Sequence, residues 1–488
     1  MGDFRNVLRP VGCLIAATAL SACAVGPDYR QPEVPVPDAW HSQAPSSTRP
    51  DASADETLAN WWTVLNDPTL NQLVEQALAQ NTTVKQAVAR VTESRARRAI
   101  TRASFWPNIG ASVSGSKSDS DSTFSTDNPQ FTTGNRDVYD AGIDASWEID
   151  LFGGTRRSYE SSTAQLAATE ADLRDVLITL LGDVALSYVD LRTSQSRLNF
   201  AERNLESQRE VVDITGWRAE AGLATVLDVE QAKSSYSQTL AGIPQLQSAL
   251  EAAKNRLAVL TGQTPGALED LLAERKPIPV APADVVSSVP AEVLRRRPDI
   301  RAAERRLAAQ TAQVGVATAQ LYPSLSLSGS IGVTAGSASD LLSDGLKSNR
   351  YGVSLNVPIF QAGALLQNIK AQNALVAQAL ATYEGTVLGA YEEIENALTQ
   401  WSNEQKRHAA LIDAVESARL ARELALTQYN SGLVDFQTVL TADRDLISSE
   451  DALAVSDGQI TSNLIRLYKG FGGGWSVFPP AIVQVASP

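Results

Sequence analysis

The sequence has 488 residues and a formal net charge of −14, with 43% hydrophobic and 20% charged residues. This composition is typical of a folded protein rather than a disordered one, and the acidic balance argues against a nucleic-acid partner. Two cysteines and two histidines form no cluster with metal-ligand spacing, so we expect no metal and no cofactor.

The N-terminus has the features of a lipoprotein signal peptide. Arg5 and Arg9 form a basic region before a short apolar stretch, which is followed by Leu20-Ser21-Ala22-Cys23. This tetrapeptide resembles the bacterial lipobox, which implies removal of residues 1–22 and acylation of Cys23. An ordinary secretory signal with a chance cysteine is the alternative. Because Ala24 rather than aspartate follows the cysteine, sorting to the outer membrane is favoured by analogy.

Two similar halves make up most of the remaining chain. Phe105-Trp106-Pro107 lines up with Leu321-Tyr322-Pro323, and Ala221-Gly222-Leu223 with Ser431-Gly432-Leu433, at offsets that stay between about 207 and 216 residues. Duplication explains this order better than chance. We therefore divide the chain into a linker after the lipid anchor (23–57), a first repeat (58–262), a Pro-rich linker (263–290), a second repeat (291–470) and a tail (471–488).

Each repeat is predicted to contain one very long helix. Residues 155–221 are poor in Gly and Pro, and apolar residues recur every seven positions, namely Leu177, Val184, Leu191, Leu198, Leu205 and Val212. The second repeat has the same spacing at Leu380, Val387, Ile394 and Trp401. At 1.5 Å per residue the first helix would be about 100 Å long, which suits a coiled-coil rod or tunnel wall. Shorter helices are predicted over 68–104, 224–261, 291–321 and 434–469.

Between the helices the hydrophobic period changes to two. Strands are predicted over about 107–118, 138–152, 323–334 and 350–360, with apolar residues on one face and Ser, Asp or Gly on the other. Segments of this length and alternation are typical of transmembrane β-strands, although a soluble sandwich is the alternative. Four strands cannot close a barrel in lipid, so the chain must oligomerise. Three chains would give twelve strands with room for solvent, whereas eight would be filled by side chains.

Several short motifs carry a family resemblance. They are Cys23 with Gly26-Pro27-Asp28-Tyr29, then Trp61-Trp62, Asp67-Pro68-Thr69-Leu70, Leu294-Arg295-Arg296-Arg297-Pro298-Asp299-Ile300 and the two Gly-Leu turns. Together with the duplication, they make the chain resemble the TolC family of outer-membrane factors, in the lipoprotein branch that serves RND-type efflux pumps.

The resemblance implies a mainly α fold with a transmembrane β-barrel portion, assembled as a homotrimer with a twelve-stranded barrel and a twelve-helix periplasmic tunnel. The implied function is a non-enzymatic outer-membrane channel that exports small molecules such as drugs. The implied partners are a periplasmic adaptor (membrane fusion) protein, an inner-membrane RND-type transporter and outer-membrane lipid.

The resemblance also assigns candidate site residues at the ends of the long helices. The adaptor-contact turns would be Gly222, Leu223, Gly432 and Leu433, although a glycine there also serves as an ordinary helix C-cap.

A gate is implied beside these turns, in which an aspartate after the first turn bonds a tyrosine before the second. Its candidates are Asp228, Tyr429, Asp435, Thr438, Thr441 and Asp445. Thr438 and Thr441 stand where family members carry axial aspartates, so Asp435 and Asp445 are the replacements we expect. Val434 stands where some members have an arginine, and Asp443 is expected to point elsewhere. A solvated helix face is the alternative for each.

Some of these features also fit other functions. An adaptor protein would share the helices and a lipid anchor but would lack duplicated strand pairs, and a protein-secretion duct would share the architecture. An enzyme is disfavoured, because His41 lies in a linker, His408 continues the heptad series, and no phosphate loop or nucleophile elbow appears.

Overall fold

The computed structural model describes residues 24–34, 40–41, 58–118, 136–280, 296–343 and 345–474. Cys23, most of the linker from 23 to 57 and the polar connections after 118 and after 280 lie outside the described residues. The chain forms two compact units. We call them the strand unit (Met1–Pro32, Glu93–Ala168 and Ala303–Tyr383) and the helical unit (Glu33–Thr92, Thr169–Ala302 and Glu384–Pro488).

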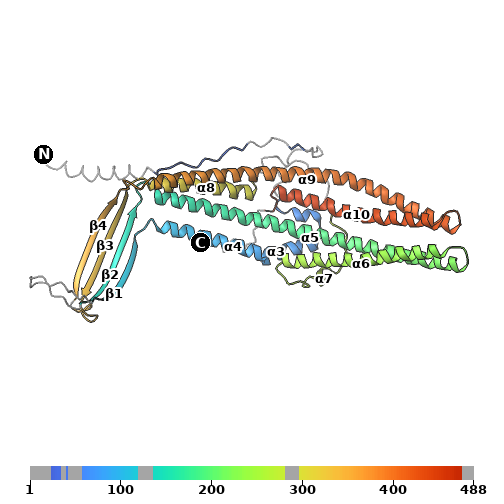
Figure 1. The fold of residues 1–488 in the computed structure, drawn as a ribbon, viewed down its shortest axis with the longest axis horizontal. Coiled ribbons are helices and arrows are strands. Elements are labelled where there is room, and N and C mark those ends of the chain that lie inside the picture. Colours follow the sequence, from blue (N-terminus) through green and yellow to red (C-terminus); the bar gives the residue numbers. More distant parts are fainter. Residues whose placement is uncertain are drawn as a thin grey trace, which may run out of the picture. The chain divides into compact units, whose positions relative to one another are not determined.

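The elements follow the predicted duplicated order (Figure 1). They are η1 (Trp61–Leu65), α3 (Pro68–Gln80), α4 (Thr82–Ala103), β1 (Asn108–Ser118), β2 (Arg136–Ile149), α5 (Gly154–Glu220), α6 (Val226–Leu260), α7 (Glu269–Leu272), α8 (Pro298–Ala319), β3 (Ser324–Ala335), β4 (Leu346–Asn356), α9 (Ala364–Asn430) and α10 (Phe436–Gly470). None of the described helices is long and apolar enough to cross a membrane.

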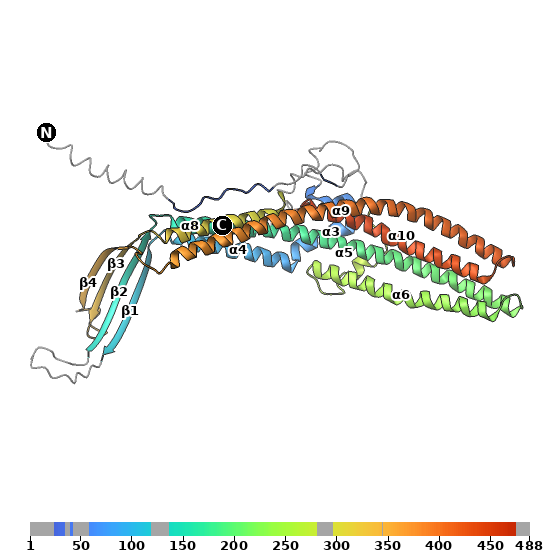
Figure 2. The ribbon, with the colours of Figure 1, turned by 45° about the horizontal axis from the view of Figure 1, so that its top comes forward.

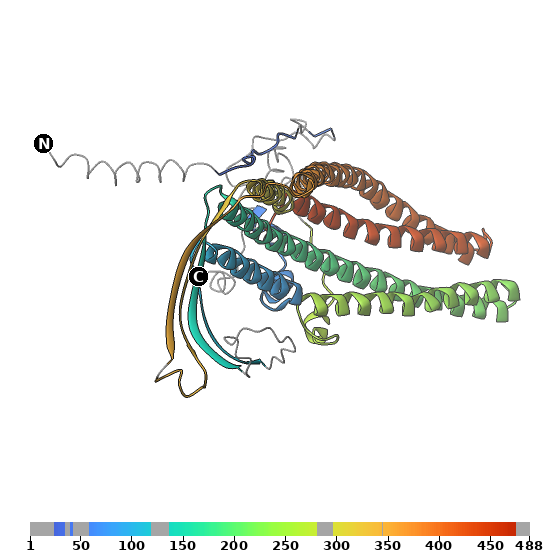
Figure 3. The same cartoon turned by 60° about the vertical axis from the view of Figure 1, so that its left-hand side comes forward.

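The strand unit contains one antiparallel sheet in the order β1-β2-β3-β4, so each repeat supplies a hairpin and β2 joins β3 between them. Figure 3 shows that the sheet curves along its strands. The register places Asp144 opposite Gly110 and Ser330, whereas Ile143 lies opposite Ala111 and Ile331. One face is therefore polar and rich in serine, and the other is apolar, as the alternation predicted.

The apolar face is not covered by other described parts of the chain. Its side chains are largely exposed, for example Val113 at 79%, Ile331 at 73% and Val353 at 70%. A contiguous exposed apolar surface of this kind is typical of a face that contacts lipid or another protein chain.

The predicted bounds of two strands were wrong. β2 stops at Ile149 because the next residue, Asp150, accepts hydrogen bonds from Thr155 N and Arg156 N and so caps the start of α5. β4 spans Leu346–Asn356 rather than 350–360. Its early end agrees with Pro358, which has no N–H to donate to a ladder and restricts the residue before it.

In the helical unit, the long helices pack through the predicted heptad positions. Leu177, Val184 and Leu191 are fully buried, and Ile394 and Trp401 are at most 4% exposed. Figure 2 shows α5 paired with α6, and α9 paired with α10, as two helical hairpins. Each long helix has 67 residues and each partner in the pair has 35.

Two of the four shorter helices depart from their predicted ranges, whereas α6 and α10 agree with 224–261 and 434–469 to within two residues. The range 68–104 is two helices, because buried Asn81 accepts from Thr83 N and Val84 N, and donates to Leu260 O at 2.8 Å. α8 begins only at Pro298, a residue suited to the first turn of a helix. Arg297, just before it, donates to Gly470 O and pairs with Asp299 and Glu393. The Arg-Pro-Asp part of the motif thus joins α8, α9 and α10.

Candidate functional site

The segment that follows Cys23 is held by a buried arginine in the strand unit. Arg157, 5% exposed, donates to the carbonyls of Val25 and Gly26 and to the carboxylate of Asp28 at 2.6 Å. Gly26, at φ +94°, crosses α8 at Gly315, where a Cβ on Gly26 would lie 2.4 Å from the Gly315 Cα. The Gly-Pro-Asp-Tyr motif therefore docks on α5 and α8, and Cys23 itself lies just before the first described residue.

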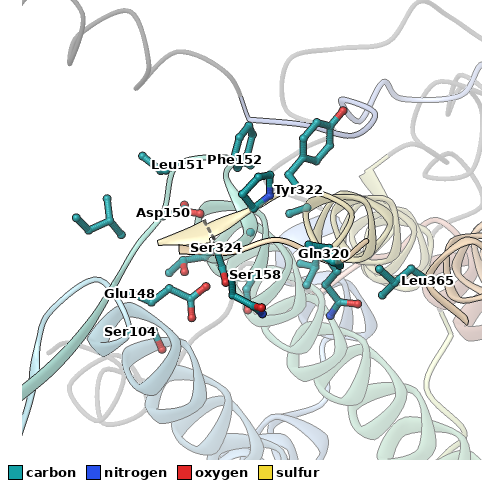
Figure 4. A pocket seen from close by; sticks show the side chains of 18 of the residues that line it. Ser104, Glu148, Asp150, Leu151, Phe152, Ser158, Gln320, Tyr322, Ser324 and Leu365 are labelled. Carbon is teal, nitrogen blue, oxygen red and sulfur yellow. Dashed lines mark hydrogen bonds between the residues drawn. The ribbon is translucent and has the colours of Figure 1, made fainter. Parts of the chain in front are cut away.

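A polar cavity lies at the strand–helix junctions of the same unit (Figure 4). It has a volume of about 480 Å³, and its lining includes Glu148, Asp150, Ser158 and Gln320. Phe152 and Tyr322, which occupy the two junctions, stack at 4.8 Å between ring centroids. The Asp150 carboxylate accepts hydrogen bonds from the main chain and the side chain of Arg156 at the α5 N-terminus. Glu148 is therefore the acidic residue of the strands that lines this cavity.

In the helical unit, both predicted turns end their helices in the same way. Gly222 has φ +75° and Gly432 has φ +74°, a conformation that favours glycine. Leu223 N donates to Arg218 O at 2.7 Å and Leu433 N donates to Gln428 O at 2.9 Å, which completes a Schellman motif in each turn. The glycines are thus C-cap residues, whereas Leu223 and Leu433 are 69% and 76% exposed.

The residues just after the turns cap the next helices. Thr225 Oγ1 accepts from Asp228 N, and the Asp228 carboxylate accepts from Thr225 N at 2.9 Å, which is a capping box at the start of α6. At the start of α10, the Asp435 carboxylate accepts from both N and Oγ1 of Thr438. These hydrogen bonds hold the pKa of Asp435 below its usual value. The stabilisation that the Asp435 carboxylate gives to the start of α10 is therefore lost as the pH falls through that lowered pKa.

The predicted hydrogen bond between Asp228 and Tyr429 is not formed within the chain. The carboxylate of Asp228 is used in the capping box, and Tyr429 Oη has no hydrogen-bond partner. Tyr429 is instead 5% exposed and packs in an apolar cluster with Ala232, Ala425, Phe436, Val439 and Leu440.

The other gating candidates share one surface of α10. Thr438, Thr441 and Asp445 are exposed, at intervals of three and four residues that place them on one helix face with Asp435. Asp443 is 8% exposed and points away from that face, as predicted. The structure thus brings these four polar residues into a stripe, apart from the buried Tyr429.

Two polar layers that were not predicted from the sequence join the hairpins. In one, Asp443 of α10 pairs with Arg422 of α9 at 2.9 Å and accepts from Gln208 of α5, which also donates to Ser235 of α6. In the other, Glu450 accepts from Arg419 and Asn204. The available signal was spacing: Asp443 and Glu450 lie seven residues apart on α10, the spacing at which coiled-coil seam residues recur.

The described residues contain no group that could hold a metal ion. His408 Nε2 lies 2.7 Å from Asp457 Oδ1, and the main-chain N–H of His41 donates to Glu395. Both histidines therefore make structural contacts between chain segments of the helical unit.

Comparison with known proteins identifies the family. A family model described as outer membrane efflux protein matches residues 73–263 and 289–473. Nodulation protein T of Rhizobium leguminosarum bv. trifolii is 34% identical over 439 residues, covering 89% of this chain and 91% of the relative. Toluene efflux pump outer membrane protein TtgI of Pseudomonas putida is 32% identical, covering 95% and 98%.

The solved structure of the outer-membrane channel OprN is 37% identical and superposes with a TM-score of 0.82, covering 93% of this chain and all of that chain. These matches agree with the duplicated, mainly helical fold and with the open, apolar-faced sheet. The chain therefore belongs to the outer membrane efflux protein family and is an outer-membrane efflux channel.

Proposed function

We propose that the chain works as a lipid-anchored homotrimer that exports small molecules through a shared twelve-stranded barrel and a periplasmic helical tunnel. The observation that carries this proposal is the sheet. Its outer strands, β1 and β4, are exposed along their whole length, and one face is apolar. Edge N–H and C=O groups without partners are not tolerated in lipid, so the edges must pair with other copies of the chain.

Family membership sets aside the adaptor alternative, because the matched residues span both repeats. The export of small apolar compounds is supported by relatives such as the toluene efflux protein TtgI. The serine-rich polar face of the sheet would line a hydrated lumen, and the apolar face would contact outer-membrane lipid.

The stoichiometry is tested by native mass spectrometry of the purified protein in detergent. We expect a complex of three chains that persists at low protein concentration. A stable monomer or dimer would overturn the trimer, since neither leaves a closed barrel with an open lumen.

Contact with a periplasmic adaptor, and through it with an inner-membrane RND-type transporter, is proposed at the turns. Exposed apolar side chains gather around the first turn, with Trp217 at 67%, Leu223 at 69% and Val226 at 75%, and Leu433 is exposed at the second. Apolar residues so exposed at a helix end are typical of a protein-contact surface.

The adaptor contact is tested with L223D and L433D combined. We expect loss of adaptor co-purification and of efflux, with trimer yield unchanged. Val280→Asp, at a residue that is 73% exposed in the linker after α7, is the matched control. Retained co-purification in the double variant, or equal loss in the control, would place the adaptor elsewhere.

A further inference from the structure

Arg218, near the end of α5, reaches across to the end of α9. Its Nη1 donates to Asn430 O at 3.0 Å, and its guanidinium carbon lies 4.6 Å from the centroid of the Tyr429 ring. Asn430 is the last residue of α9, so its carbonyl belongs to the negative end of the helix dipole. One side chain thus satisfies a terminal carbonyl and stacks on an aromatic ring of the other hairpin.

The same contact contains two unsatisfied groups. Tyr429 Oη and Arg218 Nε are both buried, and neither has a hydrogen-bond partner. Burying a donor without a partner opposes the contact, because the group would be hydrated if the two helix ends moved apart. The stacking and the bond to Asn430 O favour the joined arrangement, whereas the two unpaired groups oppose it.

The two repeats have diverged at these positions. Counting back from the aligned turns, Arg218 corresponds to Gln428, and Tyr429 corresponds to Ala219. The cation is supplied only by the first hairpin and the ring only by the second. The contact therefore forms once per chain, between the hairpins, and cannot form within either of them.

We propose that Arg218 is the latch that holds the two hairpins of one chain together at their turns when the channel is closed. This inference rests on the proposed channel function and replaces Asp228 with Arg218 as the residue that acts on Tyr429. Its unpaired donors make the latch reversible, since separation of the turns hydrates both groups.

The first test compares R218Q with R209Q in single-channel recordings in planar bilayers. Arg209 is exposed on the same helix and makes no hydrogen bond within the described part of the chain. We expect R218Q to raise the fraction of time in the open state about five-fold, which is the order of the stabilisation from one cation–π contact. R209Q should match the parent. Equal behaviour of the two variants would overturn the latch.

The second test is Y429F, for which the latch and the predicted Asp228–Tyr429 hydrogen bond give opposite changes in the open fraction. If Asp228 bonded Tyr429, removing the hydroxyl would open the channel. In the latch, Y429F keeps the ring and removes one unsatisfied buried group, so the open fraction should fall below that of the parent. Opening of the channel by Y429F would overturn the proposal.

Amide hydrogen exchange separates the latch from the channel function. In R218Q, residues 427–433 should exchange about five-fold faster than in the parent, and R209Q should leave them unchanged. The trimeric tunnel is tested separately by native mass spectrometry, so its failure would leave hydrogen exchange able to decide the latch. Unchanged exchange in R218Q would overturn it.

Discussion

Asp443 offers the sharpest test of how the hairpins are joined. Asp443→Ala removes the charge partner of Arg422 and the acceptor of Gln208, at a site where the Arg422 and Asp443 side chains are only 21% and 12% exposed. Breaking one side of a largely buried pair leaves an uncompensated charge, so we expect the free energy of unfolding to fall by about 3 kcal/mol. Asp445→Ala, two residues away on the exposed stripe, should stay within about 0.5 kcal/mol of the parent.

The assay is urea unfolding of the purified protein in detergent, followed by circular dichroism of the helices. A double-mutant cycle with R422A isolates the pair, because removing both charges avoids the buried unpaired one. We expect a coupling energy of about 2 kcal/mol between Asp443 and Arg422. Equal effects of the two aspartate substitutions, or a coupling near zero, would show that this layer does not hold the hairpins together.

Three further predictions follow from the strand unit. Mass spectrometry of the mature protein should show acylated Cys23 as its first residue, and an unmodified cysteine would refute the lipid anchor. Val353→Arg should cost about 2–4 kcal/mol and reduce membrane-inserted protein, whereas Ser354→Arg on the polar face should be mild; equal damage would contradict the face assignment. Gly315→Leu should displace the segment after Cys23, because a Cβ there would meet Arg157 Cγ at 2.7 Å, and faster proteolysis after Arg30 would report it. Unchanged proteolysis would mean that the segment is held by other contacts.

The sequence predicted the long helices and the strand faces well, because both depend on regular periodicity. The heptad at Leu177, Val184 and Leu191 and the alternation in β3 survive in the structure almost residue by residue. Element ends were less predictable because single residues decide them. Asn81 divides the predicted helix 68–104 in two because it caps the start of α4. Asp150 likewise ends β2 because it caps the start of α5.

The contacts of the candidate gating residues were harder to predict than the fold. Asp228 and Tyr429 fit a family pattern, yet the pattern does not state which hydrogen bond a carboxylate makes when a capping box is also available. Arg218 gave no signal, because an arginine near a helix end is common and its contact lies 211 positions along the chain. Contacts between segments that are distant in sequence can be identified only from the folded structure.

The helix N-caps after the two turns show how the two halves of the sequence have diverged. In the first half threonine opens the helix and aspartate stands three residues later, and in the second half the two residue types have exchanged places. Either order provides oxygen atoms for the free N–H groups of the first turn. The two halves therefore form the same kind of helix cap with the two residue types in opposite order. An aspartate near a turn therefore cannot be equated with an aspartate near the other turn until its bonding partner is known.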